Sequence, residues 1–505
     1  MAAWTPRLSK SRFQAGLQCP KYLWLLCRAP ALADPISEGK QAIFDQGHTV
    51  GELARQVFPG GVLVEEDYTQ GDQAIQTTAC LLSDGAACLY EGAFRHDGVF
   101  VRPDALFKED GRNWALIEVK SSAEVKPEHI TDLGIQAYVL RGAGLPVGSM
   151  RLLHLNSDYV YPGGAYDLGQ LFALEDLTPQ VESFIESIPG LLRQFRQMLS
   201  GPMPEIQISR RCENPYSCPF FGYCHSFLPE FPVTEIPRIA GDVLCSLLGD
   251  GYCSIREVPL DYPGLTPTQR EVCDVIQTGE ARFAPELKNE LSRLREPIHF
   301  LDFETWRSAL PVFPQTRPYQ ALPVQWSLHT LDGGLRHTEF LHTDGTDPRR
   351  PFITSLLPAL GADNGNADDS PIVVYSGYES RILADLARDL PEFAGPIAAV
   401  QARLFDLYKV ISANVQHPGF HGSHSLKYVL PALVPDLSYG GLAIQNGETA
   451  MLRWQEAIYG GAPESVRSAI CTDLRSYCAT DTLAMVRLYE ELLRVPVEWV
   501  ERKGR

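Results

Sequence analysis

Four cysteines stand at the two ends of the first half of the sequence. Cys19 lies near the start, and Cys212, Cys218 and Cys224 follow close together much later in the chain. Thiolates bind metal ions and inorganic clusters, and one centre can use all four only if both ends of this segment meet. The split set therefore predicts a first domain whose opening helix is tied to its last residues.

The composition indicates an ordinary globular protein. The 505 residues are 45% hydrophobic and 21% charged, which suits about three domains of roughly 150 residues each. No apolar run approaches the roughly 20 residues that cross a bilayer, and we see no signal peptide, so we expect a cytoplasmic protein. The net charge of −18 argues against a passive nucleic-acid coat. It does not exclude an enzyme that meets phosphate through bound cations.

The hydrophobic pattern divides the chain into three expected parts. Residues 1–227 indicate a mixed α/β domain, 228–297 a linker with a small helical connector, and 298–505 a second α/β domain. Within the connector, Thr266-Pro267 indicates a helix start, with threonine as the N-cap and proline in the first turn.

The first domain is expected to combine helices with antiparallel strands. Apolar residues three and four apart predict helices over Ser9–Cys27, Ser37–Phe58 and Glu128–Arg141. The dipeptide Asp97-Gly98 predicts a hairpin turn. The strands expected from alternating residues are Cys88–Arg95, Val99–Phe107 and Trp114–Val119.

Two of these strands carry the residues of a candidate hydrolytic site. Asp104 lies on one strand and Glu118 on the next, where both can hold a divalent cation beside a phosphodiester. Lys120 is two residues after Glu118 and shares its face of the strand, so it can orient a water or stabilise charge on the phosphate. His48, on the second helix, can complete the metal shell. Taken alone, such residues more often form a solvated surface.

Residues 8–225 resemble RecB-type nucleases of the PD-(D/E)xK superfamily. The likeness is strongest to the iron-sulfur branch, with its CRISPR-associated RecB-like exonucleases and the AddB nuclease domain. It implies a restriction-endonuclease-like fold and a structural [4Fe–4S] cluster held by one cysteine before the nuclease core and three after it. The residues implied are Cys19, Cys212, Cys218 and Cys224 for the cluster, and His48, Asp104, Glu118, Lys120 and Gln136 for the nuclease motif.

Zinc is the alternative metal for the cysteine set. Four thiolates also suit a tetrahedral zinc ion, but structural zinc sites usually contain paired C-x2-C motifs. The four cysteines here form no such pair. The sequence therefore favours the cluster.

The second α/β domain carries its own set of acids. Asp302 and Glu304 share one face of the strand His299–Phe303 and its continuation, and two such carboxylates repel unless a cation lies between them. Glu379 follows a buried strand and opens a helix. Tyr477 and Asp481 are four residues apart in a long predicted helix, Ser465–Leu493, and so share one face.

Residues 298–493 resemble the tyrosine-containing DEDD exonucleases, which are DnaQ- and RNase D-like proteins with an RNase H-like fold. They also resemble an uncharacterised domain family that is often fused to RecB-like nucleases. The likeness implies a magnesium or manganese centre and a tyrosine, Tyr477, that orients the attacking water. The implied ligands are Asp302, Glu304, Glu379 and Asp481. Glu379 stands where the family has aspartate, and Asp406 is a substitute candidate.

These features together predict a metal-dependent nuclease with two hydrolytic sites. The expected substrate is DNA, with RNA left open, and single-stranded or end-bearing forms are favoured. Repair, recombination or anti-phage defence are the expected settings. The competing hypothesis is a scaffold that binds nucleic-acid ends, with one or both sites inactive. The sequence lacks a Walker-type G-x-x-x-x-G-K-[ST], so we expect no built-in ATP motor.

Overall fold

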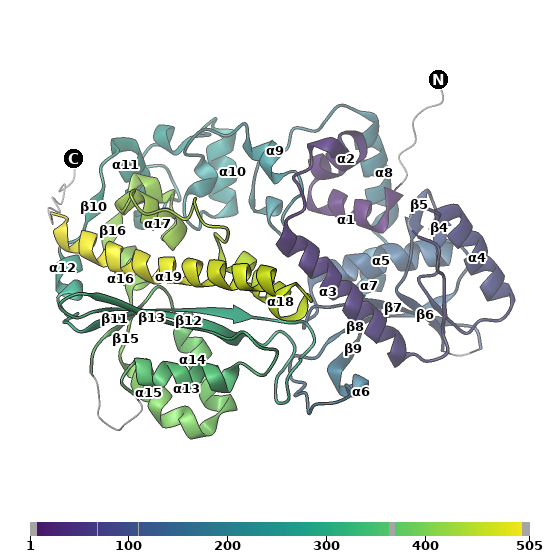
Figure 1. Ribbon diagram of the computed structural model, residues 1–505. Coiled ribbons are helices and arrows are strands. Elements are labelled where there is room, and N and C mark those ends of the chain that lie inside the picture. The colour runs from purple at the N-terminus through teal and green to yellow at the C-terminus, as the bar shows by residue number, and fades with distance from the viewer. Residues whose placement is uncertain (1–7, 68, 110, 363–368, 497–505) are drawn as a thin grey trace. The chain divides into compact units, whose positions relative to one another are not determined.

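The computed structural model describes residues 8–67, 69–109, 111–362 and 369–496. Helices and mixed sheets alternate along the chain, so the predicted α/β class is confirmed (Figure 1). The chain forms two compact units. The first unit is Met1–Phe227 with Ser308–Gln320, and the second is Leu228–Arg307 with Ala321–Arg505. Within the described residues, no helix is both long and apolar enough to cross a membrane.

The first unit is built on a six-stranded sheet in the order β2-β3-β6-β7-β8-β9. Its central strand, β7, is antiparallel to β6 and parallel to β8. The bounds are β2 Val62–Leu63, β3 Cys88–Tyr90, β6 Ala105–Lys108, β7 Trp114–Lys120, β8 Val147–Leu155 and β9 Phe172–Asp176. A three-stranded sheet, β1-β5-β4, comprises β1 Leu8–Ser9, β5 Val99–Val101 and β4 Phe94–His96.

The expected strand Val99–Phe107 is wrong in one respect. The structure breaks it at residues 102–104, and its halves β5 and β6 enter different sheets. Pro103 explains the break, because proline has no N–H to give to a sheet. Asp104 therefore lies just before β6 rather than within a strand. The turn at Asp97-Gly98 is confirmed, with positive φ at both residues.

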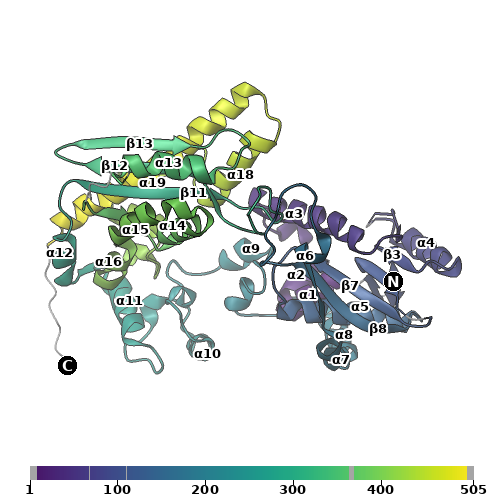
Figure 2. The ribbon, with the colours of Figure 1, turned by 90° about the horizontal axis from the view of Figure 1, so that it is seen from below.

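Helices cover this sheet, and α5 packs on it over β7 and β8 (Figure 2). The helices of the first unit are α1 Lys10–Gln18, α2 Pro20–Arg28, α3 Glu38–Ala54, α4 Gly71–Ser83, α5 Pro127–Gly142, α6 Leu168–Leu171, α7 Thr178–Ile185, α8 Ile188–Ser200 and α9 Phe221–His225. The single helix expected over Ser9–Cys27 is two helices. Cys19 is extended, with φ −159° and ψ 122°, because Pro20 cannot continue α1 and instead begins α2.

A segment from the middle of the chain completes the first unit. Ser308–Gln320 follows β11, Ile298–Trp306, in sequence but packs with residues of the first unit. The N–H of Ala309 donates to Gln46 Oε1 at 3.0 Å. Tyr161 exchanges backbone hydrogen bonds with this segment, donating to Thr316 O at 2.9 Å and accepting from Gln315 N at 2.7 Å. The expected linear domain boundaries did not include this excursion.

The second unit is built on a five-stranded sheet in the order β13-β12-β11-β14-β15. Strand β12 is antiparallel to both β13 and β11, whereas β11, β14 and β15 are parallel to one another. The bounds are β11 Ile298–Trp306, β12 Leu322–Leu331, β13 Leu335–Leu341, β14 Ile372–Val374 and β15 Leu404–Asp406. A two-stranded sheet pairs β10 Arg282–Phe283 with β16 Val415–Gln416.

The two faces of this sheet are covered by different helices. Helix α19, Glu464–Arg494, lies along one face. The other is covered by α13 (Arg349–Ala359), α14 (Tyr378–Asp389) and α15 (Ala394–Ala402) (Figure 1). Phe300 packs in the α19 core, whereas Leu301 and Phe303 pack in the opposite core. Because side chains alternate along a strand, even-numbered residues of β11 face α19. The sequence pattern of β11 thus directs two acids toward that helix.

The remaining helices of the second unit are α10 Gly241–Gly249, α11 Pro267–Thr278, α12 Glu286–Leu291, α13 Arg349–Ala359, α14 Tyr378–Asp389, α15 Ala394–Ala402, α16 Leu407–Asn414, α17 Leu426–Leu433 and α18 Gly447–Tyr459. The predicted start of α11 is confirmed. Thr266 Oγ1 accepts from Gln269 N at 3.3 Å, and the Gln269 side chain accepts from Thr266 N at 2.9 Å. This reciprocal cap satisfies two backbone donors that the first turn leaves open.

Candidate metal centres

In the first unit, the structure brings Asp104, just before β6, beside Glu118 near the end of the antiparallel strand β7. Asp104 Oδ2 accepts the backbone N–H of Val119 at 2.6 Å. This bond fixes the carboxylate beside the strand that carries Glu118. Burial and the nearby Glu118 carboxylate raise the pKa of Asp104 to about 7.

Glu118 is the most enclosed acid of this site, with a side chain only 1% exposed. Its Oε1 accepts from Lys120 Nζ at 2.7 Å and from Lys10 Nζ at 2.8 Å. Its Oε2 accepts from Gln136 Nε2 at 2.7 Å. Burial alone would raise the pKa of Glu118, but the two ammonium groups outweigh it and hold the pKa well below its usual range.

Two residues of this network were missed by the sequence analysis. Lys10 is the first residue of α1, and Asp132 lies on α5, where its Oδ2 accepts from Lys120 Nζ at 2.6 Å. The signal for Asp132 was its position four residues before Gln136, which puts both on one face of α5. Lys10 stood in a basic segment without a motif around it.

His48 lies on α3, as expected, with an exposed side chain. It lines a cavity of about 190 Å³ with Asp104, Glu91 and Tyr90. However, no group of three metal-binding side chains with ligand atoms within 4.8 Å of one another includes His48 among the described residues. The structure therefore places His48 in the same cavity as Asp104, but not in a closed ligand set with Asp104 and Glu118.

In the second unit, three carboxylates meet between β11 and α19. Ligand oxygens of Asp302, Glu304 and Asp481 all lie within 4.8 Å of one another. Burial and mutual repulsion raise the pKa values of Asp302 and Glu304 well above normal. Burial raises the pKa of Asp481 to about 6, although hydrogen bonds from tyrosines oppose the shift. Like charges at this separation favour a bound cation, and oxygen ligands suit Mg²⁺ or Mn²⁺. These residues therefore fit the expected metal.

Two tyrosines hold Asp481. Tyr477 lies one turn earlier on α19 and hydrogen-bonds to the Asp481 side chain. Tyr439 donates its hydroxyl to Asp481 Oδ1 at 2.5 Å, and the two tyrosine rings lie 6.1 Å apart. Tyr439 was missed because it stands in the irregular segment 434–446, where no period or motif marks it. Cys478 contacts Asp302, with Sγ 3.6 Å from Oδ2.

Glu379 lies apart from this group of three. It is in the first turn of α14, is 3% exposed, and its Oε2 has no hydrogen-bond partner among the described residues. Burial and the Asp406 carboxylate raise the pKa of Glu379 to about 7. Asp406 itself caps α16 by accepting from Lys409 N at 3.2 Å. Neither acid joins the group within 4.8 Å, although the charge of Glu379 contributes to the raised pKa values of Asp302 and Glu304.

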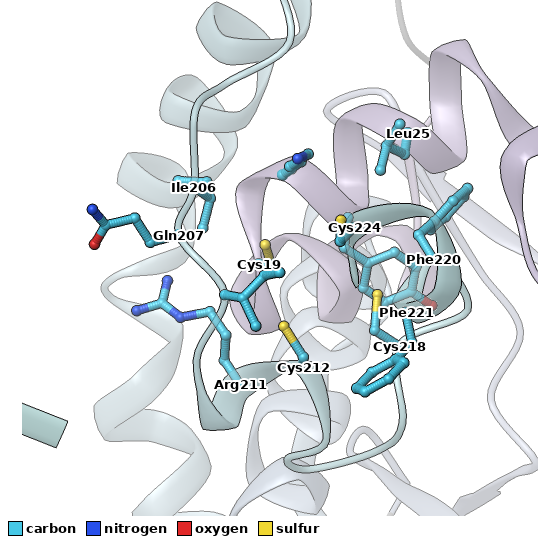
Figure 3. Close-up of a pocket in the computed structure, with 13 residues that line it drawn as sticks. Cys19, Leu25, Ile206, Gln207, Arg211, Cys212, Cys218, Phe220, Phe221 and Cys224 are labelled. Carbon is cyan, nitrogen blue, oxygen red and sulfur yellow. The ribbon is translucent and has the colours of Figure 1, made fainter. Parts of the chain in front are cut away.

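The four cysteines of the split set line one small cavity of about 20 Å³. Figure 3 shows their side chains, from the α1–α2 junction and from residues 212–224, around a common space. The N–H of Cys218 donates to Cys212 O at 2.8 Å, which shapes the turn between them. Burial and the neighbouring thiols raise the pKa of Cys218 to about 11. All four are free thiols. No three of their sulfur atoms all lie within 4.8 Å of one another among the described residues, but a cavity lined by four thiols offers the donors of a thiolate-bound metal centre.

Comparisons with known proteins name no activity for this arrangement. Residues 299–425 match the family described as "Domain of unknown function (DUF2779)". This stretch contains Asp302, Glu304 and Glu379 but ends before Asp481. "Uncharacterized protein MG366" of Mycoplasma genitalium is 21% identical over 219 residues, which are 40% of this chain and 33% of that protein. The match thus spans about a third of the relative's length.

A solved structure, "Crystal structure of SSO0001", aligns with 44% of this chain and 87% of its own. The identity is 13% and the TM-score 0.21, which is too low to support an argument about the fold. Functional conclusions therefore depend on the geometry of the candidate sites.

Proposed function

We propose that this protein is a metal-dependent nuclease that acts on DNA through two hydrolytic sites. The observation that carries the proposal is the group formed by Asp302, Glu304 and Asp481. The carboxylates of Asp481, which is buried, and of Asp302 and Glu304, which are partly buried, have ligand oxygens within 4.8 Å of one another, and none of them forms an ion pair within the described residues. Such a group is costly unless a cation neutralises it, and a site of this type serves phosphodiester hydrolysis.

The chemistry divides between the cation and the side chains. When bound, Mg²⁺ or Mn²⁺ would neutralise the phosphate and activate a water. The three carboxylates hold the cation, and Tyr477, held against Asp481, orients the attacking water. Glu379 and Asp406 form an outer acid pair. For the second unit we propose an RNase H-like exonuclease fold of the DEDD type that trims 3′ ends. A central β11 with antiparallel strands on one side and parallel strands on the other supports this fold.

For the first unit we propose a RecB-like PD-(D/E)xK nuclease that trims single-stranded ends. The support is the close set of Asp104, Glu118, Lys120 and Gln136 on β7 and its neighbours. Asp104 and Glu118 hold the divalent cation, and Lys120 stabilises negative charge on the phosphate. Cytoplasmic location remains a prediction from the sequence.

For the cysteine cavity we propose a [4Fe–4S] cluster with a structural role. The support is the convergence of Cys19 with three cysteines that follow the nuclease core in sequence. Metal analysis of anaerobically purified protein tests the assignment. About four iron and four sulfide per chain are expected for such a cluster. One zinc per chain, without iron, would instead establish the tetrahedral thiolate site.

One cleavage experiment tests the proposed activity. The protein is incubated with end-labelled single- and double-stranded DNA and RNA in Mn²⁺ or Mg²⁺. The Asp104→Asn/Glu118→Gln variant should lose one activity, the Asp302→Asn/Glu304→Gln variant the other, and the quadruple variant both. Unchanged cleavage by the quadruple variant would refute the proposal. End binding without cleavage by the wild type would favour the scaffold hypothesis.

A further inference from the structure

Lys10 is held firmly at the edge of the first unit's acidic site. Strand β1 pairs in parallel with β5, with Leu8 opposite Val99 and Ser9 opposite Phe100. Ser9 then caps α1, its Oγ accepting from Arg12 N at 3.3 Å. Lys10 is the first residue after this cap. The strand pairing and the helix start therefore both fix the backbone position from which its side chain extends.

The ammonium group of Lys10 shares a buried acceptor with a second lysine. Lys10 Nζ lies 2.8 Å from Glu118 Oε1, and Lys120 Nζ lies 2.7 Å from the same oxygen. Lys10 Nζ is also 3.7 Å from Asp132 Oδ2. One ammonium group and Gln136 already satisfy Glu118 as a buried acceptor. A second lysine on the same oxygen is therefore not needed to stabilise the buried Glu118 carboxylate.

The balance of charges shows what the second lysine can do. Asp104, Glu118 and Asp132 face Lys10 and Lys120, so the fully ionised set carries one net negative charge. A bound divalent cation would turn this into one net positive charge, which matches the single negative charge of a phosphodiester. Without Lys10, the same loaded set would be neutral and would not attract phosphate. The neighbouring Glu91 is paired with Arg102 at 3.6 Å, so that pair leaves the balance unchanged.

We propose that Lys10 is a phosphate-binding residue of the first unit, which pairs with Glu118 in the absence of metal and turns to the phosphodiester once a divalent cation occupies Glu118. The inference rests on the proposed nuclease function of this unit. The side chain can make this move, because it is 26% exposed whereas Glu118 is 1% exposed. Asp132 remains as a second anchor near the ammonium group.

The proposal predicts opposite effects on metal and on nucleic acid. An ammonium group that shares an oxygen with an incoming cation repels it, so Lys10 weakens metal binding while no substrate is present. Once metal is bound, the same charge attracts the phosphate. A lysine that served only to hold Glu118 in place would affect metal binding in the other direction, since its loss would misplace the ligand.

The test uses Lys10→Met and Lys10→Gln in the full-length Asp302→Asn/Glu304→Gln protein, in which the second unit is silenced. Lys108→Met, an exposed lysine at the end of β6, is the matched control. Mn²⁺ affinity is measured by electron paramagnetic resonance without nucleic acid, and kcat and KM are measured on a single-stranded DNA oligonucleotide. Glutamine keeps a donor for Glu118, so one of the two variants remains informative if the other does not fold.

The expected result is Mn²⁺ binding about tenfold tighter and a KM for DNA about tenfold higher in both variants, with the control unchanged. Unchanged or weaker Mn²⁺ binding, or an unchanged KM, would overturn the role of Lys10 while leaving the nuclease assignment intact. If the background protein itself neither binds Mn²⁺ nor cleaves DNA, the function of the first unit fails, and the proposal for Lys10 fails with it.

Discussion

The two acidic sites differ in how the negative charge of their carboxylates is offset. In the first unit, Glu118 is neutralised by two lysines and its pKa lies below the usual range. In the second unit, Asp302 and Glu304 have no ion-pair partner within the described residues, and burial and mutual repulsion raise their pKa values. In the first site Glu118 is thus paired with cationic side chains before metal arrives, whereas the acids of the second site depend on protons or a bound cation to offset their charge.

The side chains that neighbour the acids also differ between the two sites. In the first site, lysine ammonium groups lie next to the acids, and their positive charge can attract a phosphate. The second has hydroxyl groups, from Tyr439 and Tyr477, and a thiol from Cys478. We therefore expect the first site to depend on positive side-chain charge and the second on hydrogen bonding to Asp481.

The largest expected effects are on catalysis. Lys120→Met should lower cleavage by the first unit about 1,000-fold, because the variant lacks the positive charge that stabilises negative charge on the phosphate in the transition state.

Tyr477→Phe should lower 3′ trimming by the second unit about 100-fold, because a water-orienting hydroxyl is lost. Each variant should leave the other activity unchanged. Initial rates on end-labelled strands measure both, with Asp332→Asn in the exposed β12–β13 turn as control. Parallel losses in both activities would show that the sites are not independent.

The next effect is on stability, with opposite signs in the two units. Lys10→Met/Lys120→Met leaves Glu118 buried without a cation and should destabilise the first unit by about 3–5 kcal/mol. Asp302→Asn removes one of the repelling charges and should stabilise the second unit without divalent cations. Urea unfolding in a chelator, followed by hydrogen exchange of β7 and β11 amides, separates the units. The same sign for both variants would contradict the contrast.

The pH dependence should also differ. Folding raises the pKa values of Asp302, Glu304 and Asp481, the last to about 6. The folded form therefore binds more protons than the unfolded form. The stability of the second unit should fall, by about 2–3 kcal/mol in a chelator, as the pH rises from 4 to 8. Mn²⁺ should reverse the loss. Hydrogen exchange of β11 amides across this range measures it, and a pH-independent result would contradict the raised pKa values.

The smallest expected effect concerns Tyr439. Tyr439→Phe removes a hydrogen bond of 2.5 Å to Asp481, and a hydrogen bond to a charged group contributes about 1.5–3 kcal/mol. Because Tyr477 still holds Asp481, we expect the lower end of this range, a loss of about tenfold in Mn²⁺ affinity at the second unit. Calorimetric titration measures it, with Tyr408→Phe on α16 as the control tyrosine. Wild-type affinity in Tyr439→Phe would show that Tyr477 suffices.

The regular elements were largely predictable from periodicity. The long helix expected over Ser465–Leu493 is α19, Glu464–Arg494, and the strand that carries Asp302 and Glu304 is β11. Alternation on β11 indicated that both acids share a face, and the structure places them with Asp481. The breaks within these elements were not predicted. Pro20 and Pro103 interrupt elements that their apolar patterns suggested were continuous.

The side chains that complete the sites were less predictable. Lys10 and Glu118 are 108 residues apart, and no local pattern records a contact over such a distance. Tyr439 reaches Asp481 from an irregular segment. Glu379 was expected beside the other acids, yet it lies outside their group, because its place depends on how α14 packs rather than on its position after β14. Sequence spacing fixes faces, whereas tertiary packing decides which faces meet.

The most direct test of the account is anomalous scattering from crystals soaked in Mn²⁺. We predict one peak between Asp104 and Glu118 and another among Asp302, Glu304 and Asp481. Lys10 should then have moved away from Glu118. The absence of a manganese peak at both sets of carboxylates, after soaking at a saturating Mn²⁺ concentration, would contradict the claim that these acids form metal centres.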